Sequence, residues 1–158
     1  MLNLKVLLHT FLFFLFISSS TALPSEKGPA EVFIKIGKQF IVEKKWESAV
    51  SEFKKAVEAE PTNGYAHASK GVALSRLNEH KDALLAYEKA LYYGYDDPFF
   101  RYNRGFSFAQ LNLLEEAEKE FKAALKLNSR MVMADYDLGI IYKLQGRYQE
   151  ASKQVDKL

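Results

Sequence analysis

The 158-residue sequence predicts an all-α fold made of about four copies of one helical unit. Glycine recurs with a step of 34 residues, at Gly37, Gly71, Gly105 and Gly139. Alanine keeps the same step, at Ala49, Ala83, Ala117 and Ala151. A period this strict indicates a stacked array, because each copy must then meet the same local packing demands. No segment shows sustained alternation of apolar and polar residues, so the sequence predicts no strand.

Each unit is expected to consist of two antiparallel helices, which in the first copy cover about residues 31–43 and 47–59. A glycine on the first helix and an alanine on the second allow the two backbones to approach closely. Phe40 and Phe53 are expected to fill the space beside that contact. The two ladders therefore predict where the helices of each pair touch.

Turn and cap signals separate these helices. Turns are expected at residues 43–45, 77–79, 111–113 and 145–147, and three of the four carry Asn or Gly where a left-handed backbone is tolerated. Asp97 followed by Pro98 predicts the start of a helix in the third copy, with aspartate as N-cap. Thr62-Asn63 and Asn128-Ser129 are expected to cap the first helices of copies two and four.

The side chains around the ladders follow a known pattern. With Ala30 as position 1, the first copy places these residues in register: Phe33, Ile36, Gly37, Phe40, Ala49, Phe53, Ala56 and Pro61. The chain thus resembles the tetratricopeptide repeat family, whose pattern is aromatic-x2-Leu-Gly-x2-Tyr, then Ala-x3-Phe, then Pro. The resemblance implies a right-handed α-solenoid of stacked antiparallel helix pairs over residues 30–158. It divides into repeats 30–63, 64–97, 98–131 and an incomplete fourth repeat, 132–158.

Several positions depart from the family pattern. Polar residues replace large apolar ones on the first helices, at His67, Lys70, Arg101, Arg104 and Asp135. Tyr95 and Ser129 stand in place of the proline, and Val155 stands in place of an aromatic residue. The fourth repeat also lacks the polar capping helix with which such arrays usually end. Three interpretations stay open: its last helix is its own cap, packs on a second molecule, or belongs to a longer architecture.

The N-terminus predicts a secretory signal peptide over residues 1–22, followed by a short leader at 23–29. One positive charge, Lys5, precedes the apolar run Val6–Ile17, and Ser20 and Ala22 form an A-x-A-like cleavage site. The alternative is an uncleaved membrane anchor, but a spanning helix needs about 20 apolar residues. We therefore expect cleavage, no membrane span afterwards, and an exported protein that is periplasmic, cell-envelope or secreted. The absence of cysteine excludes a bacterial lipoprotein.

Composition and motifs exclude several function classes. Without residues 1–22 the chain keeps 21 basic and 20 acidic residues, so it has no general attraction to nucleic acid or anionic membrane. His67 and His80 lack the spacing of a metal site, and the sequence contains no H-E-x-x-H, no G-x-S-x-G and no cysteine nucleophile. We therefore expect no enzymatic activity, no metal and no cofactor.

The family resemblance implies that the first helices line a concave groove. Carried onto this sequence, its partner-binding residues are Lys35, Lys38, Tyr65, Ser69, Val72, Phe99, Tyr102, Asn103, Phe106, Met133, Tyr136, Asp137 and Ile140. Aromatic residues occupy the middle of this set, as in many peptide-binding surfaces, and charged residues occupy its rims. The competing interpretation is that the aromatic rings pack between neighbouring repeats and that the lysines are solvated helix charges.

Some members of the family grip a chaperone C-terminus with a clamp of Lys, Asn and Arg side chains. The corresponding residues here are Ile34, Lys38, Ser69, Phe99 and Asn103, or, one repeat later, Ala68, Val72, Asn103, Met133 and Asp137. Neither set matches the clamp, so docking to cytosolic chaperones is not expected.

The sequence therefore predicts a non-enzymatic interaction module that binds a peptide or protein segment, of unknown identity, in its concave groove. The alternative is a structural subunit of an envelope assembly or a homo-oligomer. Such a subunit would associate through its convex or terminal faces, including the uncapped C-terminal repeat.

Overall fold

The computed structural model describes residues 28–156, so the expected signal peptide and most of the leader lie outside the described residues. The described part of the chain contains helices and no strand. The helices are α2 (Ala30–Val42), α3 (Trp46–Ala59), α4 (Gly64–Arg76), α5 (His80–Tyr92), α6 (Pro98–Gln110), α7 (Leu114–Leu127), α8 (Val132–Leu144) and α9 (Tyr148–Val155). The predicted all-α fold is confirmed.

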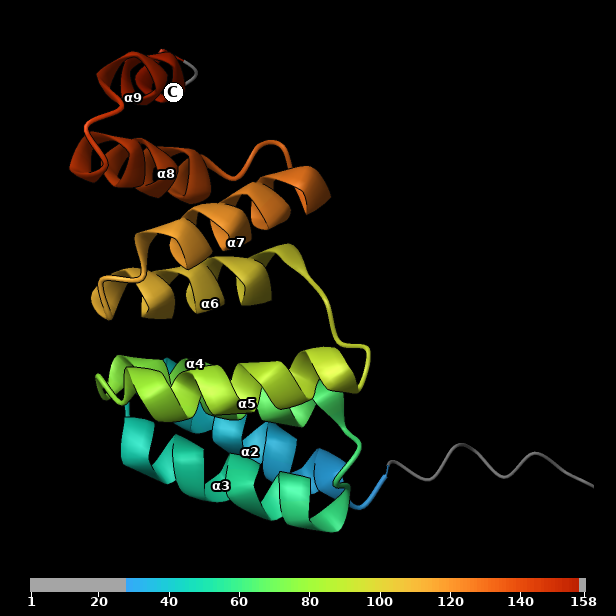
Figure 1. Cartoon of the computed structure of the whole chain (residues 1–158). Coiled ribbons are helices and arrows are strands. Elements are labelled where there is room, and N and C mark those ends of the chain that lie inside the picture. The colour runs from blue at the N-terminus through green and yellow to red at the C-terminus, as the bar shows by residue number, and fades with distance from the viewer. Residues whose placement is uncertain (1–27, 157–158) are drawn as a thin grey trace, which may run out of the picture.

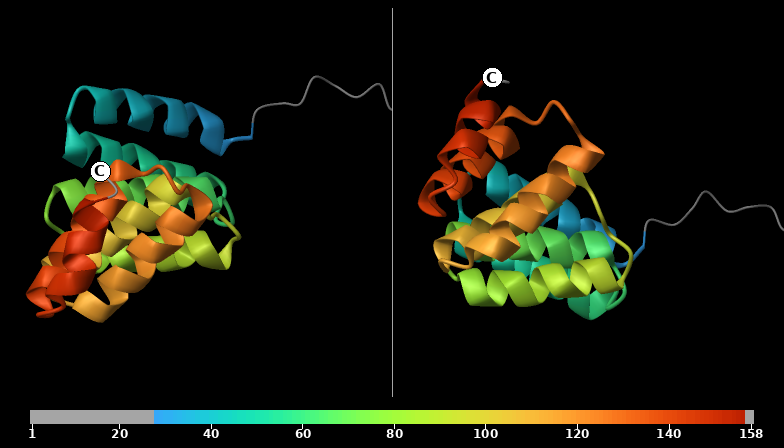
Figure 2. Two further views of the ribbon diagram at one scale, coloured as in Figure 1. Left: turned by 90° about the horizontal axis from the view of Figure 1, so that it is seen from above. Right: turned by 45° about the horizontal axis from the view of Figure 1, so that its top comes forward.

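The helices form four pairs that stack in chain order, with the pair α2–α3 and the pair α8–α9 at opposite ends (Figure 1). Each second helix contacts the first helix of the following pair, as in α3 with α4 and α5 with α6. The first helices also contact one another, α2 with α4 and α4 with α6. Figure 2 shows that successive pairs are rotated relative to each other, which gives the stack its superhelical twist.

The glycine ladder marks the contact between the two helices of a pair in the first three repeats. A Cβ atom on Gly37 would lie 2.8 Å from the Phe53 ring, and one on Gly71 would lie 2.5 Å from the Tyr87 ring. Gly105 stands in the same relation to Phe121, at 2.9 Å. These distances leave no room for a methyl group, so glycine is required by the ring that packs on it.

The fourth glycine lies in a different environment. A Cβ atom on Gly139 would first meet the Cβ of Gln154, at 3.5 Å, which is an ordinary van der Waals distance. Ala151 is also only half-buried, whereas the first three alanines of its ladder are fully buried. The repeat that lacks the usual aromatic residue is therefore the loosest of the four pairs.

The turns inside the pairs use the left-handed backbone that the sequence predicts. Asn78, Asn112 and Gly146 have φ values of 62°, 59° and 76°. In the first repeat the same position is occupied by Lys44, with φ of 57°. A lysine gains nothing from this conformation, because its Cβ crowds the backbone there. The shape of the turn is therefore imposed by the packing of α2 on α3.

Two of the three expected helix caps are present. The Asn63 side chain accepts a hydrogen bond from the Ala66 N–H at 2.9 Å, and Asp97 accepts one from the Phe100 N–H at 2.7 Å. The expected cap of the fourth repeat is wrong. Met131 precedes α8 without a side-chain cap, and the Asn128 side chain accepts a hydrogen bond from the Arg130 N–H instead.

Polar residues that depart from the family pattern find partners inside the stack. Arg101 and Arg104 approach the buried carboxylate of Glu120 at 3.1 and 2.7 Å. Arg101 also donates two hydrogen bonds to Asp96, at 2.7 and 2.8 Å, and its pKa is raised by the two carboxylates. Arg101 and Arg104 stand at positions that are apolar in the family pattern, so ion pairs to Glu120 replace apolar contacts between α6 and α7.

Candidate functional site

We call the surface formed by the first helices α2, α4, α6 and α8 the inner face, and every predicted groove residue belongs to one of these helices. Its centre is an open hollow of about 240 Å³, the central hollow. Of the predicted residues, this hollow is lined by Tyr65, Ser69, Val72, Phe99 and Asn103. Side chains of α4 and α6 that are 34 residues apart in sequence, Ser69 and Asn103, thus meet in one site.

Hydrogen bonds fix the polar groups of the central hollow. The Asn103 side-chain amide donates to the Phe99 carbonyl oxygen at 2.7 Å, within α6. The Tyr95 hydroxyl donates to the Asp97 carboxylate, and its ring packs edge-on against Tyr65, with centroids 5.5 Å apart. Burial and the neighbouring carboxylate raise the pKa of Tyr95. The hydroxyl therefore stays protonated and keeps donating.

Sequence reasoning did not predict Tyr95 as part of the site. It lies in the connection between α5 and α6, and only residues of the first helices were assigned to the groove. Its position did carry a signal, because tyrosine stands there in place of the family's proline.

A second hollow of about 230 Å³ lies between α6 and α8. It is lined by Tyr102, Val132, Met133, Tyr136 and Asp137, of which only Val132 was not predicted. The Tyr102 hydroxyl donates a hydrogen bond to Asp137 at 2.8 Å. Burial is the main cause that raises the pKa of Tyr102, and the bond to Asp137 raises it as well. The Tyr102 ring packs against Phe121 with centroids 5.7 Å apart. Tyr102 therefore packs against the core cluster around Phe121 and also lines the second hollow.

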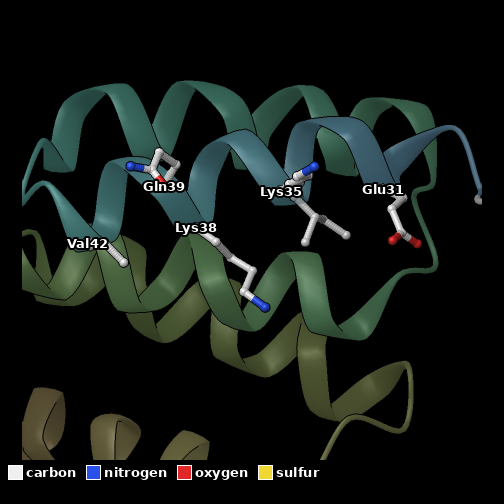
Figure 3. A pocket seen from close by; sticks show the side chains of 6 residues that line it. Glu31, Lys35, Lys38, Gln39 and Val42 are labelled. Carbon is white, nitrogen blue, oxygen red and sulfur yellow. The ribbon is translucent and has the colours of Figure 1, made fainter.

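The two predicted lysines lie at the α2 edge of the inner face. They line a hollow of about 260 Å³, the α2 hollow, together with Glu31, Ile34, Gln39 and Val42 (Figure 3). Figure 3 shows Lys38 extending from α2 towards the neighbouring helix, where its ammonium group lies 5.9 Å from the centre of the Tyr65 ring. Because Tyr65 also lines the central hollow, Lys38 connects the two sites.

Two predicted residues fall outside these three hollows. The Phe106 ring is half-buried and packs edge-on against His80 of α5, with centroids 6.1 Å apart. For Phe106 the structure therefore shows packing between repeats. Ile140 is exposed on α8 and lines none of the three hollows.

A further apolar surface lies on the second helix of the second pair. This outer patch is a hollow of about 400 Å³. It is lined by four residues of α5 and by Tyr93, which directly follows α5; the four are Leu85, Glu88, Lys89 and Tyr92. Sequence reasoning did not predict the patch, because the family pattern assigns no role to these positions.

Residues 28–156 contain no group of three His, Cys, Asp or Glu side chains placed to hold a metal ion. Within the same residues, no helix combines the length and apolar character needed to cross a membrane.

Comparisons with known proteins agree with the geometry. Similar solved structures include MamA 41-end from Desulfovibrio magneticus RS-1, with 21% identity and a TM-score of 0.75 over 84% of this chain and 75% of that one. The first TPR of Spaghetti (RPAP3), bound to the HSP90 peptide SRMEEVD, has 23% identity and a TM-score of 0.71 over 74% of this chain and 93% of that one. YrrB, described as a TPR protein with an unusual peptide-binding site, has 25% identity and a TM-score of 0.71 over 84% and 68%.

No match is found among curated proteins. The family model for the tetratricopeptide repeat, in contrast, matches residues 37–99 and 102–157, which is most of the chain. Together with the stacked helix pairs and the glycine–ring contacts, this match establishes that the chain belongs to the tetratricopeptide repeat family.

Proposed function

We propose that this chain is a non-enzymatic interaction module that holds an extended segment of a partner protein on its inner face. The observation that carries the proposal is the exposure of large apolar side chains beside the central hollow and the second hollow. Phe99 and Tyr136 are each 57% exposed, and Met133 is 48% exposed. Such side chains serve as anchors in protein interfaces, where they lose contact with water on binding.

The polar groups around these anchors are held in place before a partner arrives. The Asn103 side chain donates a hydrogen bond to a carbonyl of its own helix, and the Tyr102 hydroxyl donates one to Asp137 of α8. A preorganised surface loses little conformational entropy on binding, so more of the contact energy contributes to affinity. Two structurally similar proteins, RPAP3 and YrrB, are described with a bound peptide and a peptide-binding site, which supports the proposal.

Peptide selection followed by matched substitutions tests the proposal. Random peptides of about 12 residues, long enough to cross several helices, are displayed and selected on the full-length chain. Loss of two aromatic anchors, Phe99→Ala with Tyr136→Ala, is expected to weaken the selected peptides by at least ten-fold, or about 1.4 kcal/mol. Leu85→Ala with Tyr92→Ala removes two exposed side chains of the outer patch and is expected to change little. The opposite pattern, or no selected peptide, would refute binding on the inner face.

A specific observation also favours the second candidate, a structural subunit that associates through a terminal face. Val32 on α2 is 61% exposed, whereas its counterparts in the later repeats, Ala66, Phe100 and Ala134, are at most 3% exposed. The later residues are covered by the preceding pair, and Val32 has no such cover among the described residues. Light scattering of the purified chain tests this candidate: a concentration-dependent oligomer abolished by Val32→Glu supports it, and a monomer at all concentrations contradicts it.

Export through a cleaved signal peptide is part of the proposal. Its basis is the sequence of residues 1–22 alone. The test is the mass of the chain recovered from the exported fraction, which should correspond to an N-terminus near Leu23. An intact N-terminus at Met1 would favour the uncleaved anchor instead.

A further inference from the structure

Carboxylates and ammonium groups of the inner face differ in how far they are already paired. Asp97 accepts hydrogen bonds from the Phe100 N–H and from the Tyr95 hydroxyl. Asp137 accepts one from the Tyr102 hydroxyl. Both acids, one beside the central hollow and one beside the second hollow, therefore already accept hydrogen bonds from groups of the protein itself.

The two lysines of the α2 hollow are in the opposite state. Both are exposed, and within residues 28–156 neither ammonium group forms an ion pair. Lys38 lies over the Tyr65 ring at 5.9 Å, a contact that holds the ammonium group at the border of the central hollow without neutralising it. One acid, Glu31, lines the same hollow, so the hollow carries one negative and two positive side chains.

Large apolar side chains are exposed at the far side of the inner face. Phe99, Met133 and Tyr136 are exposed there, and the one acid among them, Asp137, is hydrogen-bonded to Tyr102. The inner face is therefore asymmetric: it offers free positive charge over α2 and exposed apolar side chains over α6 and α8.

We infer that the bound segment has a matching asymmetry, with acidic side chains over α2 and a large apolar side chain over α6 and α8. This inference rests on the proposed function and specifies the partner's chemistry at the same site. Charge complementarity of this kind fixes the direction in which a segment lies and excludes basic competitors, even where each exposed ion pair adds little affinity.

Helix spacing sets the distance between the two features of the segment. The helices α2, α4 and α6 contact one another in sequence, and packed helix axes lie about 8–10 Å apart. Two such steps span roughly 20 Å, which an extended chain covers in about six residues. The expected motif is an acidic residue followed or preceded, about six positions away, by a large apolar residue that reaches α6.

The peptides selected on the full-length chain also test this inference, with a second pair of variants. Lys35→Gln with Lys38→Gln is expected to weaken acidic peptides about five-fold at low salt and less at high salt. Lys81→Gln with Lys126→Gln removes the same charge from exposed positions of α5 and α7, and is expected to leave affinity within about two-fold.

The outcomes separate this inference from the proposed function. The inference is supported if the selected peptides carry the acidic and apolar motif, and if their affinity falls on the Lys35 and Lys38 substitutions but not on the Lys81 and Lys126 substitutions. Peptides that depend on Phe99 and Tyr136 but lack acids, or bind equally without the two lysines, overturn the inference and leave the proposed function standing. Peptides whose affinity changes neither with the Phe99 and Tyr136 substitutions nor with the Lys35 and Lys38 substitutions overturn the inference and the proposed function. The absence of any selected peptide does the same.

Discussion

The two faces of a first helix follow opposite rules, as α6 shows. On the face turned to α7, a Cβ atom added to Gly105 would lie only 2.9 Å from the Phe121 ring, and Arg104 forms an ion pair with the buried carboxylate of Glu120. On the inner face, Phe99 is exposed and borders an open hollow. One face is filled to its limit and the other is left open. Changes on the first face should alter folding stability, and changes on the second should alter binding.

The largest expected effect is on the filled face, at the charge cluster of the third repeat. Glu120→Ala should lower the free energy of unfolding by about 3–5 kcal/mol, because Arg104 loses its carboxylate partner and Arg101 keeps only Asp96. Chemical denaturation measures the change. Glu58→Ala is the control, since it removes only an exposed partner of Lys54 and should cost about 0.5 kcal/mol or less. Equal effects of the two substitutions would mean that the cluster does not hold α6 to α7.

The glycine ladder offers a matched pair of substitutions. Gly71→Ala should lower the free energy of unfolding by about 1–3 kcal/mol, because the new methyl group would overlap the buried Tyr87 ring and approach the Ala83 carbonyl oxygen at 3.1 Å. Gly139→Ala should instead be neutral or stabilise by up to about 1 kcal/mol, since a helical alanine there meets no close neighbour. Thermal unfolding of both variants measures the two changes in stability. Equal losses would show that the fourth pair is packed as tightly as the others.

A smaller effect is expected in the turn of the first repeat. Lys44→Asn should raise the free energy of unfolding by about 0.5 kcal/mol, because asparagine tolerates the left-handed backbone better than lysine. The reverse change at the equivalent turn, Asn78→Lys, should lower it by a similar amount. Midpoints of denaturant unfolding measure both. If the signs were the same, the local backbone would not determine the stability of these turns.

Sequence reasoning predicted the fold better than the site, for a physical reason. Ladder positions and turn residues such as Asn78 and Asn112 act locally, so their roles can be read from spacing. The cap expected at Asn128 failed because a capping side chain also needs the correct backbone path before α8. Within the site, Tyr65 and Asn103 were placed by register. The direction of the Phe106 ring depends on His80 of another repeat, which register does not specify.

The absence of cysteine provides the most direct test of the central claim, that a partner segment binds on the inner face. A single cysteine is introduced either at Met133 on the inner face or at Leu85 on the outer patch, which are both exposed. Alkylation of each thiol is then timed with and without a selected peptide. At a peptide concentration about ten times its Kd, the Met133→Cys thiol should react roughly ten-fold more slowly, and the Leu85→Cys thiol at an unchanged rate. Protection of the Leu85→Cys thiol alone would place the partner on the outer patch and contradict the account.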